Sequence, residues 1–180
     1  KFLQPTAACL LPLLASACVG SRKAIEPTLQ LRSEHGMELG VSTDYGIVFL
    51  GNATDAGTLE ITAWFGDGPS IETTAVEPIG HGLYTAETEI VLPSVAITFS
   101  VPETGSLVEV RGRRGWDVWS LMLPIAEHPQ VEGLLLAFPG DLPEDGPKID
   151  QVGAGVYVQG ANKTLRLLGL VSGIPVLEPD

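Results

Sequence analysis

The sequence predicts an all-β fold, an antiparallel β-barrel or sandwich of about ten short strands. Apolar residues recur at every second position through most of the chain, which is the period of a strand with one wet face. Glycine, proline, asparagine and aspartate separate these runs. No long amphipathic helical pattern is present, which disfavours parallel βαβ units because their crossovers need about a dozen helical residues.

The first half of the chain carries five predicted strands. Leu29 and Leu31 alternate with Gln30 and Arg32, and the turn residues before Gly36 end this run. A short apolar run after Asp44-Tyr45-Gly46 predicts a strand that is buried on both faces. The predicted strands of this half are Leu29–Arg32, Met37–Val41, Ile47–Leu50, Leu59–Phe65 and Ile71–Val76.

The second half continues in the same way. The clearest alternation in the chain predicts a strand over residues 95–101, with Val95, Ile97, Phe99 and Val101 on one face. Trp116 and Trp119 are an odd number apart, so one is expected in the core and the other at a surface. The other predicted strands are Leu83–Leu92, Leu107–Arg111, Trp116–Leu123, Val131–Phe138 (or one helical turn leading into a strand), Val152–Val158 and Leu165–Val171.

The N-terminal segment has the pattern of a signal peptide. Lys1 is its positive charge, the run Leu10–Leu14 is its apolar region, and Ala15-Ser16-Ala17 has the small-residue spacing that signal peptidase reads. A membrane-spanning helix needs about 20 apolar residues, whereas this run contains a proline and soon reaches Arg22. Residues 1–17 are therefore predicted to be a cleaved leader.

The residues around Cys18 resemble the lipobox of bacterial lipoproteins. The match is Leu14-Ala15-Ser16-Ala17-Cys18, and in that family the cysteine becomes the lipid-carrying first residue. The chain has two cysteines, and because Cys9 lies in the leader, the mature chain has one thiol, for which acylation is a use. The resemblance implies lipidation (palmitate) at Cys18, a tether over residues 18–27 and a β domain over residues 28–180.

The location follows from the same resemblance. Val19 is not the aspartate that retains lipoproteins at the inner membrane, so the expected location is the bacterial cell envelope, facing the periplasm, with the outer membrane favoured over the inner one. The alternative is a plainly secreted protein with an ordinary signal peptide whose flanking cysteine is accidental.

The charge of the chain excludes one class of partner. The whole chain has 22 acidic and 10 basic residues, a net charge of −12, and the leader contains one of the basic residues. A domain this acidic repels phosphate backbones, so nucleic acid is not an expected partner. The expected contacts are a membrane, through the N-terminal lipid, and an unknown protein or peptide.

A C-terminal hairpin resembles the nucleophile hairpin of trypsin-like (chymotrypsin-fold) peptidases. The residues that carry the resemblance are Asp150–Val158 and Leu165–Gly173, and Gly105–Gly112 is similar to an earlier strand of that family's second barrel. The resemblance implies a double barrel. The nucleophile position falls on Val152, whose methyl groups cannot attack a carbonyl, and the family's histidine motif is absent. A catalytic triad is therefore not expected.

We expect the other candidate sites to be solvated features of the surface. Asp141, Glu144, Asp145 and Asp150 are acidic but lack the spacing of a calcium loop. His35, His81 and His128 lie beside turn residues without metal-ligand spacing and are expected at the surface. The glycosylation sequons at Asn52 and Asn162 matter only in a eukaryotic secretory pathway.

The sequence thus predicts a non-catalytic β domain, lipid-anchored in the envelope, that acts as a binding or structural module and needs no cofactor or metal. Two alternatives stay open. One is a catalytically inactive relative of the trypsin-like peptidases that presents a peptide-binding groove. The other is an enzyme of unrecognised type that uses the acidic loop and the histidines.

Overall fold

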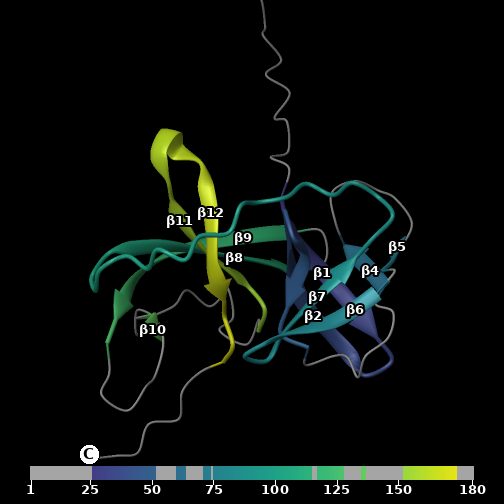
Figure 1. Cartoon of the computed structure of the whole chain (residues 1–180). Coiled ribbons are helices and arrows are strands. Elements are labelled where there is room, and N and C mark those ends of the chain that lie inside the picture. The colour runs from purple at the N-terminus through teal and green to yellow at the C-terminus, as the bar shows by residue number, and fades with distance from the viewer. Residues whose placement is uncertain are drawn as a thin grey trace, which may run out of the picture.

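The protein consists of two antiparallel β-sheets that lie side by side (Figure 1). The computed structural model describes residues 26–51, 60–63, 71–73, 75–114, 117–127, 135–136 and 152–173. Strands account for most of this part of the chain, and a short 3-10 turn is its helical element. The predicted all-β, antiparallel fold is confirmed. Among the described strands no pairing joins the two edges of either sheet, so the arrangement is that of a sandwich.

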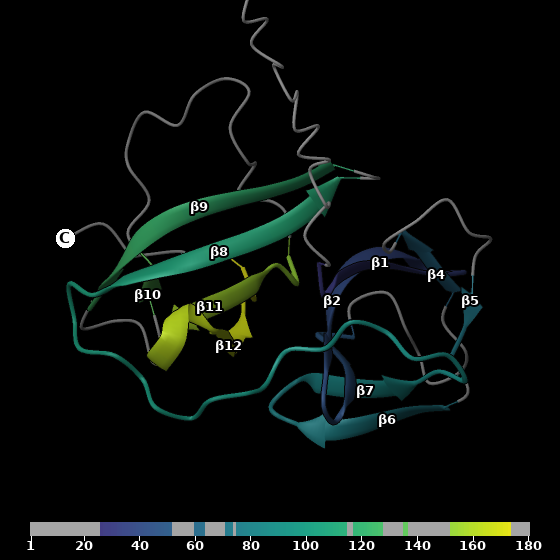
Figure 2. The same cartoon turned by 90° about the horizontal axis from the view of Figure 1, so that it is seen from above.

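The first sheet has seven strands in the order β5-β4-β1-β2-β3-β7-β6. It is strongly curved: seen from above, β1 and β4 lie on one side and β6 and β7 on the other (Figure 2). The strands are β1 (Thr28–Ser33), β2 (Gly36–Thr43), β3 (Gly46–Phe49), β4 (Glu60–Ala63), β5 (Ile71–Glu72), β6 (Ala75–Gly80) and β7 (Leu83–Glu87).

The inner face of this curved sheet holds one hydrophobic core. Leu29 and Leu31 of β1 and Ile47 and Phe49 of β3 are almost completely buried there. Their alternation with outward residues is the period-two pattern that the sequence shows. Each fully buried aliphatic or aromatic side chain contributes about 1.5–3 kcal/mol relative to an exposed one. This core therefore holds β1, β3 and β7 together.

The second sheet has five strands in the order β10-β9-β8-β11-β12. Its core contains Val108 and Val110 of β8 and Leu123 of β9, and Trp119 is partly buried against it. The Trp119 ring lies over Gly112, where an added Cβ would come within 2.1 Å of a ring carbon. The elements are β8 (Leu107–Arg114), β9 (Asp117–Ala126), β10 (Leu135–Leu136), β11 (Gly155–Gln159), the 3-10 turn η1 (Ala161–Lys163) and β12 (Leu165–Leu170).

The segment between β7 and β8 crosses from one sheet to the other, and here one prediction is wrong. Residues 95–101 are not a strand: Val95 forms an isolated bridge with Thr43 of the first sheet, and Ile97 forms one with Leu167 of the second. Val95 is buried, whereas Phe99 is 91% exposed. The alternation does not mark a strand with one buried face, because Val95 is buried whereas Phe99 and Val101 on the same side are exposed, and the segment has no continuous partner strand.

Two predicted boundaries also differ. β7 ends at Glu87. Beyond it the chain no longer pairs, and Leu92 packs into the core on the inner face of the first sheet. The strand predicted over residues 71–76 is divided between β5 and β6, which lie at opposite edges of the sheet. Trp116, Trp64 and most of the run 131–138 lie outside the described residues.

Candidate functional site at the junction of the two sheets

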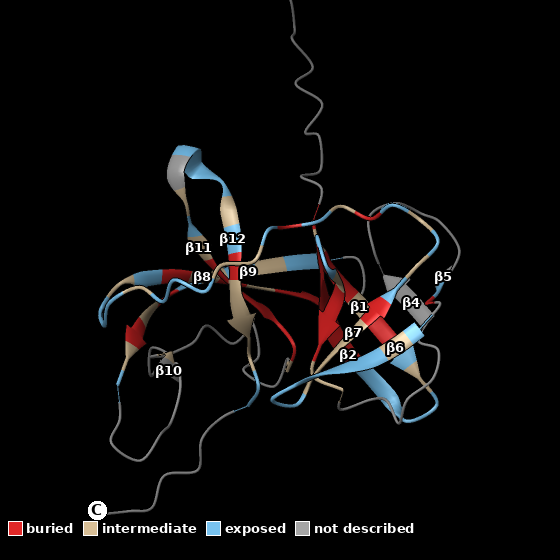
Figure 3. Ribbon diagram, viewed as in Figure 1, coloured by how far each residue is buried: buried red, intermediate tan, exposed pale blue. Residues whose placement is uncertain are grey.

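The outer face of the first sheet forms the junction with the second. Thr28 pairs with Val41 across β1 and β2, so both point away from the inner core. Val41 packs against Tyr157 of β11 and Leu167 of β12. Buried red residues of both sheets meet at this junction, whereas the crossing segment is largely exposed (Figure 3). Two features of the junction, a polar cluster and an apolar groove, are candidates for a functional site.

The polar cluster connects the start of β1 to β8 and β11. Glu26 is 6% exposed, and its Oε2 accepts a hydrogen bond from Nη1 of Arg111 at 3.1 Å. Its other carboxylate oxygen accepts from the Thr28 hydroxyl at 2.8 Å. Arg111 also donates from Nε to Glu109 at 2.8 Å. The members of this polar junction cluster are Glu26, Thr28, Glu109, Arg111, Arg113 and Tyr157.

The remaining contacts close the cluster. Arg113 donates from Nε to the carbonyl oxygen of Thr28 at 2.9 Å, and the Tyr157 hydroxyl lies 3.4 Å from the Thr28 hydroxyl. The Arg111 guanidinium lies over the Tyr157 ring, 5.8 Å from its centroid. Glu26 and Thr28 therefore tie the first sheet to three side chains of the second. Glu26 belongs to the sequence range that was predicted as tether, yet it is part of the fold.

The ionisation of the cluster suits a structural role. Burial lowers the pKa of Arg111, but its bonds with Glu109 and the charge of Glu26 more than offset this, so the pKa lies above its ordinary value. Burial lowers the pKa of Arg113, and the charge of Glu26 opposes it. Burial raises the pKa of Tyr157 well above the ordinary range, against the opposing effect of its bond with Thr28. Tyr157 is therefore a neutral phenol and not a base at physiological pH.

The turn that contains Val152 lies at the same junction. Val152 and Gly153 precede β11, and the Gly153 N–H donates to the carbonyl of Val171 at 2.8 Å. Gly153 has φ +91°, and an added Cβ would come within 2.3 Å of the Leu39 carbonyl oxygen on the first sheet. Only glycine fits this close approach. The predicted nucleophile position is thus next to β2, with an alkyl side chain.

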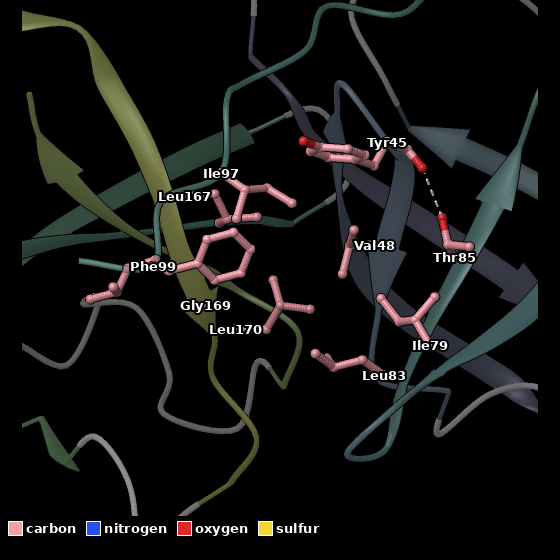
Figure 4. Close-up of a pocket in the computed structure, with 11 residues that line it drawn as sticks. Tyr45, Val48, Ile79, Leu83, Thr85, Ile97, Phe99, Leu167, Gly169 and Leu170 are labelled. Carbon is pink, nitrogen blue, oxygen red and sulfur yellow. Dashed lines mark hydrogen bonds between the residues drawn. The ribbon is translucent and has the colours of Figure 1, made fainter. Parts of the chain in front are cut away.

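The apolar groove opens beside the polar cluster, between the outer face of the first sheet and β12 (Figure 4). Its volume is about 390 Å³. One wall comes from β3, β6 and β7, and the other from β12 and the crossing segment. The lining residues are Tyr45, Val48, Ile79, Leu83, Thr85, Ile97, Phe99, Leu167, Leu168, Gly169 and Leu170.

The register of the first sheet explains why the groove is there. Val41, Val48, Thr85 and Glu77 form one cross-strand row over β2, β3, β7 and β6. Val41 is fully buried beneath the second sheet, whereas Thr85 is half-buried and Glu77 is exposed. The second sheet therefore covers the β2 end of the row and leaves the β7 end uncovered.

Local hydrogen bonds position the two aromatic side chains at the mouth of the groove. The Tyr45 backbone is fixed in the β2–β3 turn, because its N–H donates to the Thr43 hydroxyl at 3.1 Å and its carbonyl accepts from the Thr85 hydroxyl at 3.2 Å. Phe99 follows Thr98, whose N–H donates to the Leu167 carbonyl at 2.8 Å. Figure 4 shows the Phe99 ring between β12 and the side chains of Val48 and Leu83.

The structure brings few of the sequence candidates together. Val152 lies at the junction but does not line the groove. His35 and His81 lie in exposed turns of the first sheet, and His35 contacts Glu34 at 3.3 Å. Cys18, His128 and the acidic residues Asp141, Glu144, Asp145 and Asp150 lie outside the described residues. Within the described ranges, no three His, Cys, Asp or Glu side chains gather as a metal site would need.

Sequence reasoning missed both parts of the junction. In the polar cluster, Glu26 bonds with Arg111, which lies 85 positions away in the chain. No local sequence pattern reveals a contact at that separation. The groove draws its lining from several separate segments. One signal was present: Tyr45 is an aromatic residue inside a turn sequence, which places a large apolar side chain at the surface.

Comparisons with known proteins add no assignment. No protein-family model matches the sequence, and no curated protein matches it. Of the helical structure in the described part of the chain, none is long and apolar enough to cross a membrane.

Proposed function

We propose that this chain is a non-catalytic binding module of the bacterial envelope, anchored through a lipid on Cys18, which binds an apolar ligand in the groove between its sheets. The observation that carries the proposal is the exposure of aromatic side chains at the mouth of an apolar groove. Phe99 is 91% exposed and Tyr45 is 74% exposed. Adjacent large apolar side chains of this kind mark interaction sites in soluble domains.

The chemistry of the lining supports binding over catalysis. The 11 lining residues include no serine, cysteine, histidine, carboxylate or amine. Their side-chain hydroxyls are those of Tyr45 and Thr85, and the latter donates to the Tyr45 carbonyl. An apolar cleft with few polar groups is the usual form of a ligand pocket, whose volume runs from about 300 to 1,000 Å³. A nucleophile with its general base is not found in this lining.

The anchor rests on the sequence around Cys18. About seven residues separate the cysteine from Glu26, the first described residue of the fold, so an extended tether reaches about 25 Å. One diacylated residue with an additional acyl chain binds a bilayer stably, because each buried methylene contributes about 0.8 kcal/mol. Radiolabelled palmitate supplied to the native host is expected to label the wild-type chain and not the Cys18→Ala variant. Equal labelling of both would remove the anchor from the proposal.

Photo-crosslinking tests the groove. Benzoylphenylalanine replaces Phe99 in one variant and Val91 in a control, because Val91 is 94% exposed and does not line the groove. Illumination in the native host is expected to yield a discrete adduct at position 99 and none at position 91. Mass spectrometry of the adduct identifies a peptide or a lipid. Identical adducts at both positions, or none at either, would contradict a binding site in the groove.

A second candidate function is that of a catalytically inactive trypsin-like relative. The observation that favours it is the placement of the Val152–Gly153 turn against Leu39, at the junction between the sheets. In addition, β8 pairs with β11 beside β12, in the part of the chain that resembles that family. A fluorophosphonate probe that labels serine peptidases is expected to leave this protein unlabelled beside a labelled trypsin control. Labelling of the wild-type chain would contradict both functions.

A further inference from the structure

We propose that the groove takes an extended, basic-flanked peptide, which adds as a strand to the edge of β12. This inference rests on the proposed function and names its ligand. The lining alone suits any apolar occupant, from an acyl chain to a peptide. Three features favour a peptide over an acyl chain. They are the edge of β12, the path of the crossing segment and the charges near the groove.

The edge of β12 borders the groove. β12 is the last strand of the second sheet among the described residues. Leu168, Gly169 and Leu170, its second half, all line the groove. A sheet edge presents backbone N–H and C=O groups to whatever lies beside it, and an extended chain is the ligand that pairs with them.

The protein's own chain shows that this edge forms backbone hydrogen bonds with a second segment. The Leu167 N–H donates to the Ala96 carbonyl at 2.9 Å, and the Thr98 N–H donates to the Leu167 carbonyl at 2.8 Å. These two bonds form a parallel bridge between Ile97 and Leu167. This parallel bridge is isolated and extends no further along β12. The pairing therefore begins at Leu167, and the part of the edge beside the groove is left for another chain.

The backbone direction at Leu170 suits the next pair of bonds. Val171 faces β11, because its N–H donates to the Ala154 carbonyl and its carbonyl accepts from Gly153. Successive residues of an extended strand direct their backbone groups to opposite sides. The N–H and C=O of Leu170 therefore point away from β11, toward a peptide in the groove. Those of Leu167, three residues earlier, also point away, because the register between β11 and β12 shifts between these positions.

Alternate side chains of that peptide meet an apolar wall. Val48 and Leu83 lie across the groove from Leu170 (Figure 4). Every second side chain of a strand added to β12 faces the first sheet, because side chains alternate between the two faces. Small or branched apolar residues at those positions displace water from Val48, Leu83 and Ile79.

Two carboxylates that neighbour lining residues favour a basic peptide. Glu77 is exposed and lies directly across from Thr85 on β6 and β7. Asp44 precedes Tyr45 and accepts a hydrogen bond from the Ser94 hydroxyl at 2.8 Å. The whole chain has a net charge of −12. Lysine or arginine at the ends of the peptide is therefore favoured, and acidic ends are repelled.

Synthetic peptides of about seven residues test the proposal on the purified full chain. The probe is Lys-Val-Thr-Leu-Thr-Val-Lys. The first control has the same side chains with N-methylated backbone amides, and the second has glutamate at both ends. Titration is expected to give saturable binding of the probe, with affinity lower by about tenfold or more for each control. Affinity for the probe also falls as salt is added.

Two protein variants locate the site. Ile79→Ser removes apolar contact from a lining residue that is 53% exposed, and Val91→Ser removes it from a residue that is 94% exposed outside the groove. Probe affinity is expected to fall about tenfold in Ile79→Ser and to be unchanged in Val91→Ser. Circular dichroism verifies that both variants are folded.

Each other outcome overturns the inference. Equal affinity for the N-methylated peptide means that backbone pairing is not used. Absence of probe binding, with a lipid adduct at position 99, means that the groove holds an acyl chain, and the proposed function then survives without this inference. A dimer that Ile79→Ser dissociates means that a second copy covers the groove.

Discussion

Glu26 and Arg111 form an ion pair across the junction, with 3.1 Å between Oε2 and Nη1, although 85 positions separate them in the chain. Glu26 is 6% exposed. Removing one partner of a buried pair leaves an uncompensated charge, and the cost is largest when both are buried. The pair therefore contributes to joining the two sheets, beside the apolar contacts of Val41 with Tyr157 and Leu167.

Removal of the Glu26 charge is expected to weaken the junction. Glu26→Gln should lower the free energy of unfolding by about 2–3 kcal/mol, because Arg111 is only partly buried and keeps its bond to Glu109. Adding Arg111→Met to this variant should cost less than the sum of the two single changes. Chemical denaturation measures these values. Glu34→Gln, in the exposed contact with His35, is the control and should cost less than about 0.5 kcal/mol.

The buried phenol of Tyr157 predicts a loss of stability at alkaline pH. Its folded-state pKa is raised above the value of about 10 of an unfolded tyrosine. Above that pH the unfolded state releases a proton that the folded state keeps, so the contribution of Tyr157 to stability is constant below about pH 10 and falls above it. Tyr157→Phe should unfold at a higher pH than the wild type. An unchanged alkaline midpoint would show that Tyr157 does not ionise on unfolding.

The close approach of Gly153 to Leu39 makes position 153 intolerant of any side chain. Gly153→Ala should lower the free energy of unfolding by about 2 kcal/mol or more, since its Cβ would overlap the Leu39 carbonyl and φ is +91°. Gly169 is the matched control, because nothing lies within 4 Å of an added Cβ there. Gly169→Ala should stay within about 0.5 kcal/mol of the wild type. If both changes lower the free energy of unfolding equally, the close contact between the Val152 turn and the first sheet is contradicted.

Two substitutions, one at the exposed Phe99 and one at the buried Leu167, separate effects on ligand binding from effects on stability. Phe99→Ser should leave the free energy of unfolding within about 0.5 kcal/mol of the wild type, because the side chain is 91% exposed. The same change should abolish ligand binding. Leu167→Ala, at 3% exposure, should cost about 2–4 kcal/mol. If Phe99→Ser destabilises the fold as much as Leu167→Ala does, Phe99 is a packing residue.

Local periodicity predicted a strand well where that strand is paired on both sides within its sheet, as β1 and β3 are. Leu29 and Leu31 lie in β1 with the expected faces, and the run after Gly46 is β3, with Ile47 and Phe49 on one face and Val48 on the other, all buried. Residues 95–101 show the limit of the same signal. Phe99 and Val101 are exposed although they alternate with polar residues, so alternation alone reports neither burial nor whether a partner backbone runs alongside.

The candidate functional site could not be predicted from the sequence, for a related reason. Val48 and Leu170 face each other across the groove although they lie far apart in sequence, and the outer face of the first sheet becomes exposed from β7 to β6. Tertiary placement of this kind leaves no local pattern. The resemblance to a lipobox around Cys18 is the opposite case: it rests on a purely local pattern, in a part of the chain that precedes the described residues.

Mass spectrometry of the N-terminal peptide from the native protein tests the anchored-module account most directly. The account predicts a peptide that begins at Cys18, carries the added mass of acyl chains on that residue, and partitions with the membrane fraction. An unmodified Cys18, or residues 1–17 still attached, would contradict it.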